Sequence, residues 1–283
     1  MEREVIIDRV EGRMSPRMAV SDSVAIEEPL EIRVGFGDIG NRTQKSLSIT
    51  MRTPGQDADL ALGFLFSEGV LDSYQTVDRV SPCGPPNALG IINTIKVELT
   101  ANTIVDLERL KRHFYTTSSC GVCGKASLEA LKVTLPPPPN PNEPVFSPQF
   151  VHELPDRLRS HQTVFDHTGA IHAAALFSRE GNCLAVREDV GRHNAVDKLV
   201  GWALNQDLLP LSHSLLFVSG RASFELVQKA ARAGVSVFAA VGAPSSLAVE
   251  LAREQGMTLL GFVRNQRFNV YCGGARIAEG DFI

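Results

Sequence analysis

The first half of the sequence shows the alternation of apolar and polar positions that is typical of strands. Residues 31–36 and 46–51 alternate in this way, and the turn formers of residues 37–41 lie between them, so we predict a β-hairpin. Residues 57–66 predict a helix, because acidic residues lie in its first turn and a glycine follows its end. Residues 91–99 predict another strand. We therefore expect an α+β domain here.

The second half shows a different pattern, in which short apolar runs alternate with helical stretches. Residues 193–204 place apolar side chains at helical spacing. Three strands and two intervening helices are predicted to follow, over residues 215–218, 224–233, 235–241, 246–254 and 258–263. Strands and helices that alternate at this spacing favour right-handed crossovers and a parallel sheet. The predicted fold class is therefore α/β.

A proline-rich stretch separates the two patterns. Residues 136–144 read Pro-Pro-Pro-Pro-Asn-Pro-Asn-Glu-Pro, a density of proline that blocks both helices and strand ladders. We therefore predict an N-terminal α+β domain over residues 1–135, an irregular linker over residues 136–148 and a C-terminal α/β domain over residues 149–283.

Composition places the chain among ordinary soluble globular proteins. Its 283 residues are 43% hydrophobic and 21% charged, and the net charge of -4 favours neither nucleic acid nor an anionic membrane as a partner. No apolar run near the start is long enough for a signal peptide. The longest uncharged stretch, residues 235–249, is too short and too interrupted to span a bilayer. We expect a soluble, cytoplasmic protein.

The sequence contains five cysteines, and two of them, Cys120 and Cys123, form a Cys-x-x-Cys pair. An odd number argues against a disulfide framework, and a structural zinc site built only from cysteines needs four. Flanking glycines would give reagents access to the sulfur atoms. A short helix is predicted over residues 125–133, and its dipole and Lys125 would favour the thiolate. Such a thiolate could take sulfur from a persulfide, and the second cysteine could release it by forming a disulfide.

Three other interpretations of the pair remain open. The two cysteines could be half of a zinc site that a distant cysteine or histidine completes. They could be a thioredoxin-like redox pair, although no strand in the expected βαβ setting precedes them. They could also be chemically inert. Spacing alone does not separate sulfur transfer from zinc binding.

A second candidate site lies at the carboxyl ends of the predicted parallel strands, where ligands bind in open α/β sheets. Serine and glycine at a helix N-terminus offer free N–H groups to an anion, and arginine adds bidentate phosphate contacts. Ordinary helix capping with surface arginines is the alternative, and neither a Walker loop nor Gly-x-Gly-x-x-Gly is present. These loops, which suggest a phosphate- or nucleotide-bearing ligand, cover residues 219–223, 242–246 and 264–267.

A third group of polar residues includes His172 and the charged segment of residues 187–194. A lone histidine in an apolar run is often a core residue, and the charged segment could simply cap the helix that follows. In zinc deaminases, His-x-Glu is followed later by Pro-Cys-x-x-Cys. Here the Cys-x-x-Cys pair comes before His172, and Ala174 occupies the position of the glutamate. We therefore expect no deaminase chemistry.

Several of these motifs together resemble one known family, the formate dehydrogenase accessory sulfurtransferases, or FdhD family. The resemblance covers roughly residues 20 to 275 in the family's order. The string Arg-Glu-Asp-Val-Gly-Arg-His-Asn is far more specific than a cysteine pair. The resembling segments are residues 61–69, 118–125, 187–198, 219–225, 243–249 and 262–267. The first twenty residues lie outside the resemblance, and we expect them to be a disordered lead.

The resemblance implies an enzyme that carries sulfur. Such proteins pass persulfide sulfur from a cysteine desulfurase to the molybdenum cofactor that formate dehydrogenase apoenzyme requires. The acceptor is the bis-molybdopterin guanine dinucleotide form, whose guanine nucleotide ends would suit the strand-end loops. Family members are homodimers with a C-terminal domain similar to the cytidine deaminase fold. A non-catalytic cofactor chaperone and a zinc-binding module are the alternatives.

The resemblance also suggests roles for individual residues. Cys120 is the expected persulfide-bearing nucleophile, and Cys123 is a second sulfur holder or the resolving thiol. We expect neither a metal site nor a permanent cofactor. The residues expected to bind the molybdenum cofactor are Phe262, Val263, Arg264, Asn265, Gln266 and Arg267, together with His172, Arg187, Ser219, Arg221 and Ser245.

Overall fold

The structure is a computed structural model that describes residues 1–12, 16–101, 103 and 135–279. Its central element is a six-stranded mixed sheet in the order β12-β11-β10-β9-β7-β8. The three middle strands β9, β10 and β11 are parallel, as predicted, and the outer strands are antiparallel to their neighbours. The strands are β7 (His172–Phe177), β8 (Cys183–Asp189), β9 (Leu215–Val218), β10 (Val237–Ala240), β11 (Thr258–Arg264) and β12 (Arg267–Cys272).

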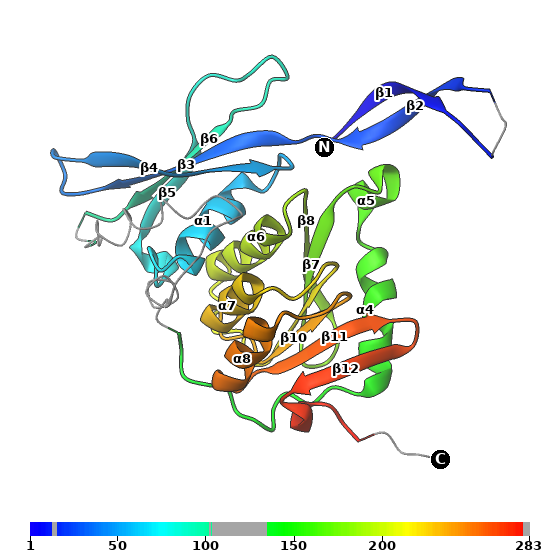
Figure 1. Cartoon of the computed structure of the whole chain (residues 1–283). Coiled ribbons are helices and arrows are strands. Elements are labelled where there is room, and N and C mark those ends of the chain that lie inside the picture. The colour runs from blue at the N-terminus through cyan, green and yellow to red at the C-terminus, as the bar shows by residue number, and fades with distance from the viewer. Residues whose placement is uncertain (13–15, 102, 104–134, 280–283) are drawn as a thin grey trace.

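Helices cover both faces of this sheet, which makes a three-layer α/β arrangement (Figure 1). The alternation of side chains along β9 explains both layers, since Leu216 and Val218 pack on one side and Leu215 and Phe217 on the other. Helices α6 (Arg192–Asn205), α7 (Phe224–Arg232) and α8 (Ser246–Glu254) cover the first side, and α4 (Pro148–Arg159) and α5 (Thr163–Thr168) lie on the second. The α/β prediction is confirmed, and the likeness to cytidine deaminases stays a prediction.

A second sheet, in the order β4-β3-β6-β5, forms the N-terminal part. The predicted hairpin of β3 and β4 is confirmed, and so are the helix α1 and the strand β6. Helix α1 lies between this sheet and α6 (Figure 1). The elements are β3 (Glu28–Phe36), β4 (Thr43–Arg52), α1 (Asp57–Ser67), the 3-10 helix η1 (Tyr74–Thr76), β5 (Val77–Pro82) and β6 (Thr94–Leu99).

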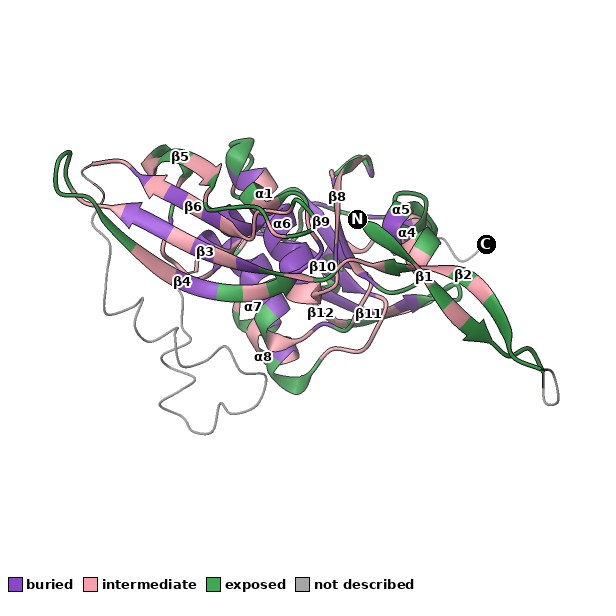
Figure 2. Ribbon diagram, turned by 90° about the horizontal axis from the view of Figure 1, so that it is seen from above, coloured by how far each residue is buried: buried purple, intermediate pink, exposed green. Residues whose placement is uncertain are grey.

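The two parts meet at a close crossing of α1 and α6. A Cβ atom on Gly63 would lie 1.8 Å from the Asp197 carbonyl oxygen, and one on Gly201 would lie 1.8 Å from the Asp59 carbonyl oxygen. Glycine at both positions therefore lets the two backbones touch. Leucines of the N-terminal sheet and of α6 join one hydrophobic cluster, so residues before and after the proline-rich stretch share a core (Figure 2).

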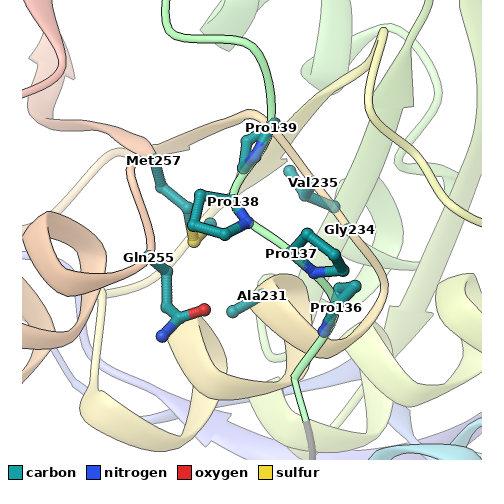
Figure 3. Close-up of a pocket in the computed structure, with 9 residues that line it drawn as sticks. All are labelled: Pro136, Pro137, Pro138, Pro139, Ala231, Gly234, Val235, Gln255 and Met257. Atoms are coloured by element: carbon teal, nitrogen blue, oxygen red, sulfur yellow. The ribbon is translucent and has the colours of Figure 1, made fainter.

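The proline-rich stretch is irregular, as predicted, but it is fixed to the C-terminal part. The buried Arg276 side chain, on the 3-10 helix η2 (Gly274–Arg276), donates hydrogen bonds to the carbonyl oxygens of Pro139, Asn140 and Glu143. Figure 3 shows Pro136 to Pro139 packed around a hollow beside Met257. Its volume of about 10 Å³ fits one water molecule and excludes a nucleotide.

The N-terminal residues form a hairpin, so the expectation of a disordered lead was wrong. Strands β1 (Glu2–Arg9) and β2 (Met18–Ala25) pair antiparallel through all eight residues of each strand. Side chains such as Ile7 and Val20, which face each other, form cross-strand pairs that stabilise the hairpin. The hairpin projects from the body, and none of its described residues is buried (Figure 2).

The remaining sequence predictions divide into tested and untested ones. Helices α6, α7 and α8 and strands β9, β10 and β11 confirm the predicted elements within a few residues at each end. The helix predicted over residues 125–133 lies outside the described residues. In the described part of the chain, no helix is both long and apolar enough to cross a membrane.

Candidate functional site

The loops that follow β9, β10 and β11 are joined by backbone hydrogen bonds. Gly242 donates its N–H to the Gly220 carbonyl oxygen at 2.9 Å, and Phe262 donates its N–H to the Gly242 carbonyl oxygen at 3.1 Å. The structure therefore brings the three loops predicted from the sequence together at one edge of the sheet, where ligands bind in open α/β folds.

Ser219 places the start of β7 beside this edge. Its Oγ accepts a hydrogen bond from Ala173 N at 2.9 Å, and its N–H donates to the Ala173 carbonyl oxygen at 2.9 Å. Among the described residues, Oγ of Ser219 acts only as an acceptor, which leaves its hydroxyl proton for a ligand. A Cβ atom on Gly220 would lie 3.6 Å from His172 Nδ1, so this loop lies directly beside the histidine.

His172 is half-buried, and its surroundings are positive. Burial lowers the pKa of His172 from its usual value of 6.5, and the charges of Arg192 and His193 lower it further, whereas Asp189 acts in the opposite direction. The imidazole is therefore mainly neutral at pH 7 and can both donate and accept a hydrogen bond.

Two residues of this edge, Arg192 and His193, lie in the charged segment of residues 187–194 but were not named individually from the sequence. They begin α6. The Arg192 Cδ lies 4.0 Å from where a Cβ on Gly220 would stand, and its guanidinium makes no hydrogen bond or ion pair with another described residue. His193 Nε2 lies 2.8 Å from Glu225 Oε2 on α7, an ion pair when the imidazole is protonated. Both residues belong to the string Arg-Glu-Asp-Val-Gly-Arg-His-Asn of residues 187–194, and their position in this specific motif could have identified them as candidates.

Most of that motif has a structural role instead. Glu188 accepts hydrogen bonds from two N–H groups in the first turn of α5. Asp189 and Lys198 form a fully buried ion pair at 2.8 Å, and Lys198 also donates to the Thr53 carbonyl oxygen at 2.9 Å. Asn194 donates to Asp189 at 3.0 Å. The motif therefore fixes the turn before α6 against the end of β4.

Arg187 lies apart from the loops. Its guanidinium donates two hydrogen bonds to Asp59 on α1, at 2.9 and 3.1 Å, and lies over the Trp202 ring with 5.6 Å to the centroid. The side chain therefore helps to join α1 and α6, and the structure does not bring it to the strand-end loops.

The other two candidates from these loops differ in what they contact. Arg221 is exposed and makes no hydrogen bond or ion pair with a described residue, and a Cβ on Gly242 would lie 2.8 Å from its Cγ. Ser245 accepts a hydrogen bond from Ala248 N at 3.3 Å and so acts as the N-cap of α8. Of these two residues, Arg221 is the one whose side chain is free to bind an anion.

Residues 262–267 form the hairpin between β11 and β12. Asn265 and Gln266 both have φ 54°, as a tight two-residue hairpin turn requires, and Arg264 pairs with Arg267 across it. Phe262 also has φ 54°, which is rare for a bulky residue, and it lies at a break in the strand register. Val263 is fully buried, so its side chain is part of the core. The exposed part of the predicted segment is therefore Arg264 to Arg267.

Known proteins similar to this chain match it along nearly its whole length. The family model described as FdhD/NarQ matches residues 25–278. The chain belongs to the FdhD/NarQ family. The protein described as sulfur carrier protein FdhD of Streptomyces coelicolor is 51% identical over 280 residues, which cover 98% of this chain and 95% of that protein. The protein of the same description from Mycobacterium tuberculosis is 49% identical, over 90% of this chain and 92% of its own.

A solved structure supports the fold of this FdhD/NarQ chain. A candidate formate dehydrogenase accessory protein from Desulfotalea psychrophila superposes with a TM-score of 0.73, over 97% of this chain and 99% of that one. The two sequences are 24% identical, so this likeness speaks for the fold alone.

The cysteines of this FdhD/NarQ chain fall into two groups. Cys120 and Cys123 lie outside the described residues. Among the described cysteines, burial raises the pKa of the Cys183 and Cys272 thiols, which makes both poor nucleophiles at neutral pH. Within the described part of the chain, no three His, Cys, Asp or Glu side chains lie grouped to hold a metal ion.

Proposed function

We propose that this FdhD/NarQ protein is a cytoplasmic, homodimeric sulfurtransferase. It takes persulfide sulfur from a cysteine desulfurase and passes it to the molybdenum cofactor of formate dehydrogenase, in its bis-molybdopterin guanine dinucleotide form. The proposal is supported by relatives about half identical to this chain that are described as sulfur carrier protein FdhD. The Cys-x-x-Cys segment provides the chemistry, and the strand-end loops provide a place for the nucleotide.

The chemistry is carried by Cys120 and Cys123. The Cys120 thiolate attacks the outer sulfur of the desulfurase persulfide, the S–S bond of the donor breaks, and the desulfurase thiolate leaves. Cys120 then carries one additional sulfur atom. When Cys123 attacks the inner sulfur of this persulfide, a Cys120–Cys123 disulfide forms and hydrosulfide is released towards the acceptor. A thiol reductant restores both cysteines for the next cycle.

The observation that carries the nucleotide part of the proposal is a set of arginines without partners at one edge. The guanidinium groups of Arg192, Arg221 and Arg267 make no hydrogen bond or ion pair with another described residue, and that of Arg264 contacts only the Phe262 ring, at 5.7 Å to the centroid. Some arginines elsewhere in the described chain are paired, as Arg52 is with Asp57 and Arg187 with Asp59. Unpaired guanidinium groups around glycine loops suit the phosphates of a nucleotide.

Maturation of formate dehydrogenase tests this function. In cells that lack their own copy of this protein, the wild-type chain should restore formate dehydrogenase activity, and Cys120→Ala should not. Cys83→Ala is the matched control, since Cys83 is isolated in sequence from the pair. Full restoration by a variant that lacks both Cys120 and Cys123 would contradict sulfur transfer and favour a chaperone that only delivers the cofactor.

A further inference from the structure

The projecting hairpin of β1 and β2 has two chemically different faces. Side chains alternate between the faces along each strand, and the side chains of facing residues share a face. The register therefore divides the hairpin into an acidic face with mostly small side chains on β2 and an apolar face. The acidic face carries Glu2, Glu4, Ile6, Asp8, Ala19, Ser21, Ser23 and Ala25, and the apolar face carries Arg3, Val5, Ile7, Arg9, Met18, Val20, Asp22 and Val24.

The apolar face has no hydrophobic partner in the described part of the protein. None of its side chains is buried, and none of its apolar side chains packs against either hydrophobic cluster of the body. Five of the 15 exposed large apolar side chains of the described residues lie within the first 25 residues. Such a concentration of exposed apolar side chains marks a protein interface. Because a two-stranded hairpin is only marginally stable by itself, a contact across this face would also stabilise it.

The hairpin is attached to the body near its base. The Glu2 carboxylate lies 3.1 Å from His167 Nδ1 on α5, and beyond this contact the hairpin projects away from the body (Figure 1). The family model begins at residue 25, so the hairpin precedes the core that this model matches. The similarity to the Streptomyces coelicolor protein covers 98% of this chain and so extends through most of the hairpin.

Two opposite charges on the apolar face lack an ion-pair partner. Arg3 lies on β1 and Asp22 on β2, and neither forms an ion pair with another described residue. When two copies stack with β1 of each over β2 of the other, each Arg3 meets Asp22 of the second copy. When β1 lies over β1, arginine meets arginine instead. The apolar face is therefore complementary to itself in the first of these arrangements.

The free edge of β1 does not offer the same fit. An antiparallel pair of two β1 strands that is centred on Ile6 places Arg3 opposite Arg9. The same register places Glu4 opposite Asp8. Like charges that face each other across strands are destabilising, and charged side chains commonly protect exposed edges in this way. The charges of β1 therefore favour contact through the face of the hairpin over contact through this edge.

From these faces and charges we infer that the hairpin of β1 and β2 is the contact surface for a second copy of this chain. The two hairpins stack through their apolar faces, and Arg3 of each copy pairs with Asp22 of the other. The inference rests on the homodimer of the proposed function and names its interface. An interface of this size lies at the small end of protein interfaces, so we expect a dissociation constant at about micromolar concentration.

Sedimentation velocity of the full chain over a concentration series tests this interface. The wild-type protein should dimerise as its concentration rises. Arg3→Asp and Asp22→Arg should each weaken the dimer about tenfold or more, because each dimer loses two ion pairs and gains two contacts between like charges. Glu4→Arg is the matched control. It changes the charge by as much as Asp22→Arg does, but Glu4 is exposed on the acidic face, so the dissociation constant should stay unchanged.

A mixture of the two variants separates the interface from any effect within one hairpin. An Arg3→Asp chain and an Asp22→Arg chain carry opposite charges at both contacts between them. The mixture should therefore dimerise about as tightly as the wild type, although each variant alone does not. Neither chain contains a restored pair of its own, so only contact between copies can produce this result.

Three results would overturn the interface. The first is a wild-type protein that stays monomeric far above micromolar concentration. The second is an equal dissociation constant for the wild type and both single variants, and the third is a mixture that does not associate. If any of these occurs and Cys120 still loads sulfur, sulfur transfer stands and only this inference fails. If the dimer behaves as expected but Cys120 loads no sulfur, the interface stands and the sulfur-transfer function fails.

Discussion

Asp189 and Lys198 form an ion pair of 2.8 Å in which neither side chain has exposed surface. Asp189 also accepts hydrogen bonds from Thr53 N at 3.2 Å and from Gly191 N at 2.8 Å. One buried pair therefore joins the chain after β4 to the turn that begins α6, where Arg192 and His193 lie. The geometry of the strand-end site depends on residues from both halves of the chain.

Removal of the ammonium group should destabilise the fold. In Lys198→Met the Asp189 carboxylate stays buried without its counter-charge, and we expect the free energy of unfolding to fall by about 3–5 kcal/mol. Urea unfolding followed by circular dichroism measures this change. Lys45→Met is the control, since Lys45 is partly exposed and should change stability by less than about 0.5 kcal/mol. Similar values for both variants would contradict the role of the pair.

The crossing of α1 and α6 should not tolerate a methyl group. In Gly201→Ala the new Cβ would lie 1.8 Å from the Asp59 carbonyl oxygen, so the helices must separate. Overpacking of this kind should cost about 3 kcal/mol or more, despite the better helix propensity of alanine. Thermal unfolding measures this loss of stability, and Glu254→Ala, at an exposed position in α8, is the control. A Gly201→Ala protein as stable as the wild type would show that the helices are further apart.

The stability of the fold should depend on the protonation of His172. Because burial and the positive charges of Arg192 and His193 lower its pKa below 6.5, the unfolded chain binds this proton more readily than the folded chain does. The contribution is complete above about pH 6.5 and is lost as the pH falls from there towards the lowered pKa of His172. Unfolding midpoints between pH 7.5 and 5 should therefore fall more steeply for the wild type than for His172→Gln. Equal slopes would contradict this.

The isolated cysteines should be poor sulfur carriers. Since burial raises the pKa of Cys183 and Cys272, little thiolate is present at pH 7, and native protein should react slowly with iodoacetamide at both sites. Peptide mass spectrometry measures the modified fraction, with urea-unfolded protein as the reference. The double variant Cys183→Ser/Cys272→Ser should still load sulfur. Rapid modification of either native thiol would contradict the assignment.

The sequence predicted those elements whose own side chains determine their structure. Strand β9 and helix α8 were predicted with the same bounds that the structure shows, because short apolar runs and capped helices are local patterns. The hairpin of β1 and β2 was missed because the two strands stabilise each other through pairs such as Ile7 and Val20. Such pairs become visible only when the register is known.

The sequence predicted at which edge of the sheet the candidate site lies, but only some of the residues that lie there. The strand-end rule predicted that the loops of Ser219 and Arg221 meet at one edge of the sheet, and the structure shows these loops joined there. Arg187 was named with them, but its contact with Asp59 depends on how α1 packs, which no local pattern reveals. Arg192 and His193 were hidden among neighbours such as Asp189 that serve the interior of the protein. Only the packed structure separates these roles.

The most direct test of sulfur transfer is the mass of the intact protein after incubation with a cysteine desulfurase and L-cysteine. The account predicts a gain of one or more sulfur atoms that a thiol reductant removes, present in the Cys183→Ser/Cys272→Ser variant and absent from Cys120→Ala. A wild-type protein that is folded and gains no sulfur, or a Cys120→Ala protein that gains as much as the wild type, would contradict the central claim.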